Sequence, residues 1–155
     1  MYSLPYILYL VFIFLLSFKC SNVKQRRDVN ILIIITYVLF LGLRGYIGSD
    51  FKMYYVLYEN IPSIGQGFFS SAYVNDLEVE LGYVIYMSII KTISSDYSFF
   101  IFINSLINIY IILLFFKRYS INVALALIVF LEIGGYVFEI DVQRNMKALL
   151  LFMLS

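Results

Sequence analysis

The chain has 155 residues, of which 63% are apolar and 14% are charged, and its mean hydropathy is +0.91. An average soluble domain is roughly 45–50% apolar and about 25% charged, so this composition excludes an ordinary soluble domain and a disordered chain. Histidine is absent, Cys20 is the one cysteine, and the net charge is only +1. These counts exclude histidine-dependent catalysis, an internal disulfide and a cysteine metal cage, and they do not indicate nucleic-acid binding.

The amino-terminal half contains two apolar runs and a long polar segment. Residues 2–18 carry no charge and are just long enough to cross a hydrocarbon core of about 30 Å, so they predict a first span. A cleaved signal peptide is the alternative, but the positive residues follow this run and do not precede it. Residues 29–43 predict a second span. The segment 44–80 is long for a connector, and we expect a functional or flexible outer loop there.

The carboxyl-terminal half is more continuously apolar. Residues 81–93, 98–116 and 121–140 predict the third, fourth and fifth spans. The last apolar run, 146–154, would cross only half a bilayer, so we expect the chain to be the first part of a longer protein. The expected fold class is therefore all-α. It is a polytopic transmembrane helical bundle of about five full spans plus the start of a sixth, in a single integral-membrane domain over 1–155.

Lysine and arginine residues divide unevenly between the two predicted sides. Seven fall on one side, namely Lys19, Lys24, Arg26, Arg27, Lys91, Arg144 and Lys147, and four on the other, namely Arg44, Lys52, Lys117 and Arg118. Because positive loops tend to stay in the cytoplasm, the first side is expected to be cytoplasmic, with the amino terminus and the loop 44–80 outside. Lys117 and Arg118 disagree with this assignment.

Arg44 ends the second apolar run and is followed by Gly45 and Gly48, which allow a ligand to approach the backbone closely. The planar guanidinium fork suits a phosphate or a diphosphate. The alternative is an arginine that only anchors the helix at the membrane surface.

Four aromatic residues follow in helical spacing. Phe51, Tyr54, Tyr55 and Tyr58 stand at i, i+3, i+4 and i+7, which predicts four rings on one face of a short helix at the outer surface. Two interpretations are open: an anchor in the membrane interface, or a platform on which sugar rings or a lipid head group stack.

Two acids lie inside the fifth predicted span. Glu132 and Glu139 are seven residues apart, close to two helical turns, so they are expected to face the same way. A carboxylate near the bilayer centre costs about 2.5–3.5 kcal/mol unless it is protonated or paired. The acids are therefore expected to contact another span, for example at Asn104 and Asn108, or to line a functional cavity.

Three short motifs occur in a fixed order. They are Gly42-Leu43-Arg44 with Gly48-Ser49-Asp50 and Tyr54-Tyr55, then Glu80-x-Gly82-Tyr83, and then Arg144 to Ala148, with Asn145 where glutamine is usual. Together these motifs resemble the EpsG-like branch of the Wzy-type polysaccharide polymerases, bacterial membrane proteins of exopolysaccharide and O-antigen assembly. The resemblance covers about the first half of a typical family member.

The resemblance implies a glycosyltransferase of the bacterial inner membrane that joins undecaprenyl-diphosphate-linked repeat units at the outer face. It implies no cofactor and no essential metal. The expected partners are the lipid-linked oligosaccharide, the lipid bilayer, and chain-length regulator and flippase proteins.

Such a transfer needs a cation near the departing diphosphate and a carboxylate that takes the acceptor proton. On the family motifs, Arg44 and Arg144 are candidates for the first role, and Asp50 or Glu80 for the second. Tyr54 and Tyr55 are candidates for substrate binding. The charge count places Arg144 in the cytoplasm, whereas the chemistry favours the outside, so either the fifth span is broken near residues 134–135 or Arg144 is structural.

Two other classes of function stay open. A transporter would use Glu132 and Glu139 as proton or cation sites on a permeation path. A noncatalytic membrane subunit would organise a glycan-assembly complex. The long, acidic and aromatic outer loop favours handling of a sugar-linked lipid over ion transport.

Overall fold

The computed structural model describes residues 4–18, 23–45, 47–64 and 79–155, and the regular structure within these ranges is entirely helical. The elements are, in order, α1 (Leu4–Ser17), α2 (Val23–Tyr37), the π-helical turn η1 (Val38–Gly42), α3 (Phe51–Asn60), α5 (Leu81–Ile93), α6 (Tyr97–Tyr119), α7 (Val123–Phe130), the π-helical turn η4 (Leu131–Gly135), α8 (Tyr136–Ile140) and α9 (Gln143–Leu154). The all-α fold class is confirmed. Lys19 and residues 65–78 of the expected outer loop lie outside the described residues.

The helices differ in their capacity to cross a membrane. Two helical stretches are long and apolar enough, α6 with 23 residues and the stretch Val123–Ile140 with 18 residues. Helices α1 and α5 are apolar but have only 14 and 13 residues. The expected count of five full spans is therefore not confirmed, although the two long helices and the apolar surface are those of a membrane protein.

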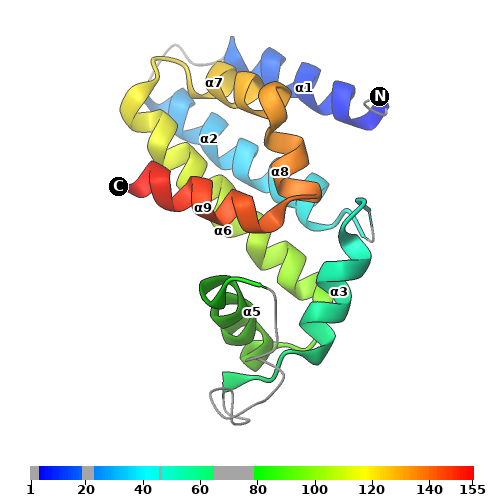
Figure 1. The fold of residues 1–155 in the computed structure, drawn as a ribbon. Coiled ribbons are helices and arrows are strands. Elements are labelled where there is room, and N and C mark those ends of the chain that lie inside the picture. Colours follow the sequence, from blue (N-terminus) through cyan, green and yellow to red (C-terminus); the bar gives the residue numbers. More distant parts are fainter. Residues whose placement is uncertain (1–3, 19–22, 46, 65–78) are drawn as a thin grey trace.

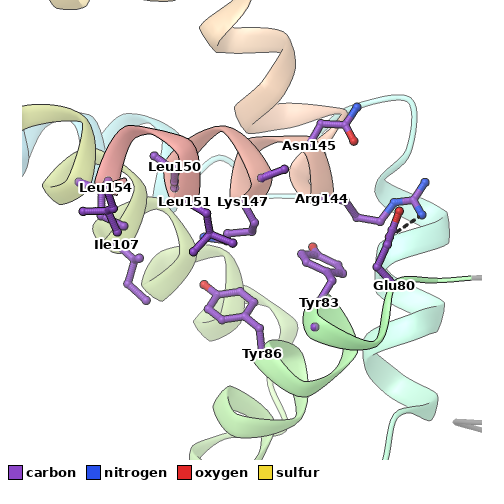
Figure 2. A pocket seen from close by; sticks show the side chains of 13 residues that line it. Glu80, Tyr83, Tyr86, Ile107, Arg144, Asn145, Lys147, Leu150, Leu151 and Leu154 are labelled. Atoms are coloured by element: carbon purple, nitrogen blue, oxygen red, sulfur yellow. Dashed lines mark hydrogen bonds and ion pairs between the residues drawn. The ribbon is translucent and has the colours of Figure 1, made fainter. Parts of the chain in front are cut away.

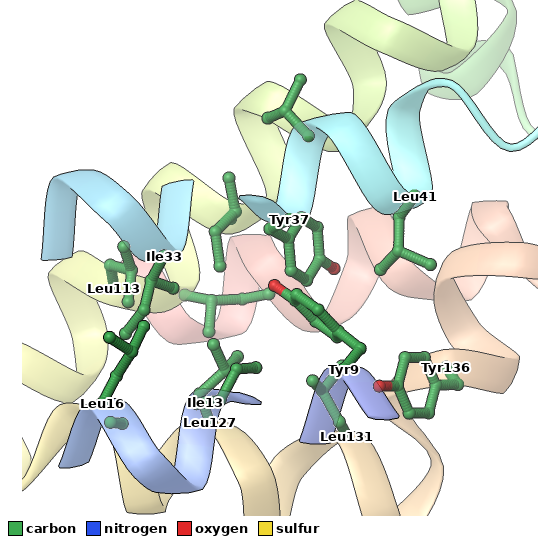
Figure 3. Packing of buried hydrophobic residues seen from close by; sticks show 14 of the residues in the cluster. Tyr9, Ile13, Leu16, Ile33, Tyr37, Leu41, Leu113, Leu127, Leu131 and Tyr136 are labelled. Carbon is green, nitrogen blue, oxygen red and sulfur yellow. The ribbon is translucent and has the colours of Figure 1, made fainter. Parts of the chain in front are cut away.

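The larger hydrophobic core joins α1, α2, η1, α7, η4, α8 and α9 to the second half of α6. In α1, Tyr9, Ile13 and Leu16 follow helical spacing and are buried on one face. Tyr9 meets Tyr37 of α2 near the centre of this core (Figure 3). Apolar residues on the other face of α1, such as Leu15, are exposed, as expected for a helix surface that contacts lipid.

A second, smaller core joins α3 and α5 to the first part of α6 (Figure 1). The short helix predicted from the aromatic spacing is confirmed as α3, but its aromatic face points inward. Tyr54 and Tyr58 are buried, and the Tyr58 ring packs against Tyr97 and Phe100. The expectation of an exposed aromatic platform is therefore wrong, because helical spacing determines a common face and not what covers it.

The helix expected over 121–140 is interrupted at Gly134. This residue has a φ of 147°, which is outside the helical region and is readily adopted only by glycine. The interruption changes the helical phase, so Glu139 is fully buried while Glu132 is exposed. The expectation that these two acids face the same way is wrong for this reason.

Each end of the bundle gathers segments that are distant in sequence. At one end, the Asn122 side chain donates a hydrogen bond of 3.5 Å to the Ser17 carbonyl, and Lys117 lines a hollow together with Arg26 and Arg27. We call this the basic end. The C-terminal end of α1, the start of α2 and the α6–α7 turn all lie there (Figure 1).

The opposite end holds Arg44 and Arg144. The Ser49 amide and hydroxyl both donate to the Asp141 carboxylate, at 2.5 and 3.1 Å, and Arg144 pairs with Glu80. Arg144 is therefore on the side of Arg44, and the seven-to-four division of charges does not hold. The physical reason is that α5 is short and packs with α3, so α6 starts at the end where η1 finishes.

This arrangement predicts the result of topology reporters. Fusions after Arg27 and after Ser120 should report the same compartment, which we expect to be the cytoplasm, because both positions lie at the basic end. A fusion after Asp141 should report the opposite compartment. Paired fusions to alkaline phosphatase and to a fluorescent protein measure this, and opposite compartments for the Arg27 and Ser120 fusions would contradict the fold.

Candidate functional site

A layer of buried polar side chains separates the two hydrophobic cores. Its buried members are Arg44 after η1, Asn104, Ser105 and Asn108 on α6, Glu139 on α8 and Gln143 on α9, and the half-buried Lys147 of α9 completes it. We call this set the polar layer. Burial of a polar group costs free energy unless the group is hydrogen-bonded. A cluster of such groups between the two cores is therefore a candidate for a specific role.

Glu139 is the centre of the polar layer. Its Oε1 accepts a hydrogen bond of 2.6 Å from the Ser105 hydroxyl, and its Oε2 accepts one of 2.5 Å from the Asn108 amide. A guanidinium nitrogen of Arg44, whose side chain is only 3% exposed, lies 3.9 Å from Oε1. The carboxylate is thus compensated by one cation and two neutral donors, which come from two separate segments, the residues after η1 and helix α6.

Lys147 is connected to Glu139 through Asn108. The Lys147 ammonium donates a hydrogen bond of 2.5 Å to the Asn108 carbonyl oxygen and lies 4.5 Å from the centre of the Tyr86 ring. Among the described residues, the polar layer therefore contains two cations and one carboxylate. This excess of positive charge in a largely dry environment favours the binding of an anion next to Lys147.

Lys147 also lines a cleft of about 490 Å³ between α5, α6 and α9 (Figure 2). One end of the cleft is polar and ionic, and it is formed by Glu80, Tyr83, Arg144, Asn145 and Lys147. The other end is apolar and is formed by Ile107, Ile111, Leu150, Leu151 and Leu154. The cleft is therefore amphipathic along its length.

Glu80 and Arg144 form an ion pair at the polar end of the cleft, with 3.0 Å between Oε2 and the guanidinium nitrogen (Figure 2). Their side chains are 69% and 31% exposed, so a ligand in the cleft has access to both. A hydrogen bond from its own backbone N–H, followed by the charge of Arg144, holds the pKa of Glu80 below its ordinary value. Glu80 is thus a carboxylate at neutral pH.

Local sequence explains how these two residues meet. Glu80 precedes α5, and its carbonyl accepts the first hydrogen bonds of that helix, from the amides of Tyr83 and Val84 at 2.9 and 3.2 Å. Arg144 stands in the first turn of α9. Tyr83 connects the two helices, because its hydroxyl donates to the Gln143 side chain at 3.4 Å.

Some of the site residues predicted from sequence line the cleft, and the others lie behind it or away from it. Glu80 and Arg144 line the cleft together. Arg44 lies behind it in the polar layer, where it also donates to the Leu41 carbonyl. Asp50 accepts a hydrogen bond from the Ser49 hydroxyl and is not among the described residues that line the cleft.

The two tyrosines predicted to bind substrate lie in the smaller core. Tyr54 is buried and does not line the cleft; its ring lies 5.9 Å from that of Tyr83, and its side chain hydrogen-bonds Arg144. The Tyr55 ring packs against Tyr97 at 5.5 Å. Their positions favour a supporting role behind Tyr83 over direct stacking on a sugar.

Sequence reasoning missed Lys147 and the bridging role of Asn108. Lys147 was counted only as a cytoplasmic charge, although it stands three residues after Arg144 and therefore on the same side of α9. Asn108 was expected to contact an acid of the fifth span, and its partner is Glu139. Within the described residues, no group of three Asp, Glu or Cys side chains is placed to hold a metal ion.

Comparison with known proteins gives one match. A family model described as the EpsG family matches residues 29–155, a range that includes the polar layer and the cleft. No curated protein and no solved structure matches the chain significantly. The resemblance drawn from the three motifs is confirmed by the family match.

The two acids of the Val123–Ile140 stretch provide a matched test of the polar layer. Glu139→Gln removes the charge that compensates Arg44 and Lys147, and breaking a buried pair in this way typically costs about 3–5 kcal/mol. Glu132→Gln changes an exposed side chain and should stay within about 0.5 kcal/mol. Unfolding of the purified variants in detergent measures both, and equal stability of the two variants would show that the layer is not held by Glu139.

Proposed function

The chain belongs to the EpsG family and is a membrane protein of polysaccharide biosynthesis, and we propose that it acts there as a polymerase. In this proposal it is a glycosyltransferase that joins undecaprenyl-diphosphate-linked repeat units. The amphipathic cleft is the observation that carries the proposal. A lipid-linked sugar diphosphate has the same division, with charge and hydroxyl groups at one end and a long hydrocarbon chain at the other.

The proposed binding mode follows from this match of chemistry. The diphosphate lies between Arg144 and Lys147, which offer a planar guanidinium fork and an ammonium group. The polyprenyl chain lies along Ile107, Leu151 and Leu154 at the apolar end. Because Asn108 and Tyr86 hold Lys147 in place, its charge needs no rearrangement when the diphosphate becomes the leaving group.

The proposed reaction is a single glycosyl transfer. A hydroxyl oxygen of the acceptor sugar bonds to the anomeric carbon of the donor, and the bond from that carbon to the diphosphate oxygen breaks. The bonding electrons leave with the diphosphate, and the acceptor proton passes to the Glu80 carboxylate. A carboxylate of lowered pKa is a weak base, which suits a proton that becomes acidic only as the new bond forms.

The proposed orientation places the polar end of the cleft at the outer surface of the cytoplasmic membrane. The amino-terminal end of α1 lies near Arg44 and Asp141, since the Tyr136 hydroxyl after the kink donates to the Tyr6 carbonyl. An amino terminus outside therefore places the cleft at the outer side, where newly flipped repeat units are available. The basic end then faces the cytoplasm, in agreement with the preference of lysine and arginine for that side.

The structure favours this function over transport. A transporter would need Glu132 or Glu139 to exchange a proton or a cation along a path. Glu139 is engaged by Ser105, Asn108 and Arg44, and Glu132 is exposed on the surface of α7–α8. Neither acid lines the cleft, whereas Glu80 does.

Substitution of the two cleft cations tests the proposal. Arg144→Gln and Lys147→Gln should each slow polymerisation, and loss of one such contact typically reduces the rate about 10²–10³-fold. In a strain that lacks the gene, either variant should leave mostly single repeat units on the surface, as seen by gel analysis of the polysaccharide. Lys52→Gln, an exposed change on α3, is the control. Normal chain lengths at normal membrane abundance would exclude the cleft as the polymerase site.

The pH dependence tests the role of Glu80. Because its folded pKa is lowered, Glu80 stays ionised as the pH falls from 7 toward its ordinary value of 4.5, and it becomes protonated only below that value. Polymer formation in membrane vesicles should therefore hold between pH 7 and 5 and decline below 4.5. Glu80→Gln should be inactive over the whole range. An active glutamine variant would remove Glu80 from the mechanism.

A further inference from the structure

Two adjoining cavities lie at the basic end, at the opposite end of the bundle from the ionic end of the cleft. The first, of about 280 Å³, lies between the start of α2, the end of α6 and the start of α7. The second, of about 680 Å³, is an open apolar groove along α7. Ser120, Ile121 and Asn122 of the α6–α7 turn line both cavities, so the two form one continuous depression.

The first cavity is strongly basic. Arg26 and Arg27 from α2 and Lys117 from α6 line it, together with the side-chain amides of Asn30 and Asn122, and none of its described lining residues is acidic. Arg27 also lies 3.9 Å from the Asp28 carboxylate, in an exposed pair. One carboxylate does not balance three cations, so the hollow keeps a net positive charge that attracts an anion. A phosphate group also accepts hydrogen bonds from guanidinium, ammonium and amide donors.

The second cavity has the opposite character. Leu125, Val129 and Phe130 of α7 line it together with Phe116 of α6. Ile121, at the junction of the two cavities, is 92% exposed. An exposed apolar groove at the end of a membrane-spanning helix is suited to hydrocarbon, and its continuity with three cations is suited to a molecule with an anionic head.

We propose that this depression binds an anionic phospholipid, with its phosphate in the basic cavity and one acyl chain in the groove along α7. A free phosphate ion would satisfy only the basic cavity and would leave the groove open. A zwitterionic phospholipid would fill the groove but would leave the cations only partly compensated. The two-part shape therefore selects a lipid that carries net negative charge. The proposal does not depend on the polymerase function, because no described residue that lines the cleft also lines either of these two cavities.

The test compares two double variants of equal charge. Arg26→Gln with Lys117→Gln removes two cations that line the cavity, and Lys24→Gln with Arg118→Gln removes two neighbouring cations that do not. The full chain is purified in neutral detergent, phosphatidylglycerol is titrated, and bound lipid is counted by native mass spectrometry. A surface cation contributes about fivefold to binding of an anionic lipid, so the cavity variant, which lacks two cations, should bind about 30-fold more weakly. The control variant should bind like the wild type.

Each other outcome overturns the proposal in a defined way. Equal weakening in both variants would indicate general surface charge and not a site. Equal binding of phosphatidylcholine and phosphatidylglycerol by the wild type would exclude selection of an anionic head, and this comparison holds even if a variant fails to fold. Full displacement of the lipid by millimolar inorganic phosphate would assign the basic cavity to the free ion.

Discussion

The burial of the Glu139 carboxylate is the constraint on which the rest of the site depends. A charge that is fully buried must be compensated locally, and here the compensation comes from η1, α6 and, through Asn108, α9. Any shift of one of these segments would leave a buried charge or amide without its partner, at a cost of several kcal/mol. The position of α9 against α6, and with it the width of the cleft, is therefore determined by polar contacts as well as by packing.

The polar layer has a structural role even where it does not increase stability. Buried ion pairs often contribute little net free energy, because desolvation offsets their attraction. The polar layer instead selects one packing arrangement of the helices. Apolar residues such as Ile109 and Met146 allow many similar packings, whereas the Asn108 amide accepts only the one in which its nitrogen meets Glu139 and its oxygen meets Lys147. Such a single arrangement is needed to hold the Lys147 ammonium in a defined position in the cleft.

The sequence predicted the helices better than it predicted how they are placed relative to one another. Apolar runs located most helices to within a few residues, because burial and membrane exposure both require apolar side chains. Glu80 and Arg144 were named from motifs, but their direct contact depends on how α5 packs, which no local pattern records. Lys147 was overlooked for the same reason, since its role becomes visible only through Asn108 on another helix.

The two misplaced features have one structural origin, which is that short irregular segments change the direction or the phase of the chain. The sequence offered a break near residues 134–135 as one of two alternatives, but it did not indicate how the break would reorient Glu139. At Gly134 one residue with positive φ turns Glu139 inward and leaves Glu132 outside, although their spacing in an ideal helix would align them. Helix α5 has 13 residues, is too short for a full crossing and packs beside α3. Helix α6 therefore starts at the end of the bundle where η1 finishes. The short α5 brings Arg44, Glu80 and Arg144 to one end of the molecule, and the kink at Gly134 turns Glu139 toward Arg44. The charge count separated Arg44 from Arg144, whereas the structure places them at one end of the bundle, as the chemistry proposed for the cleft requires.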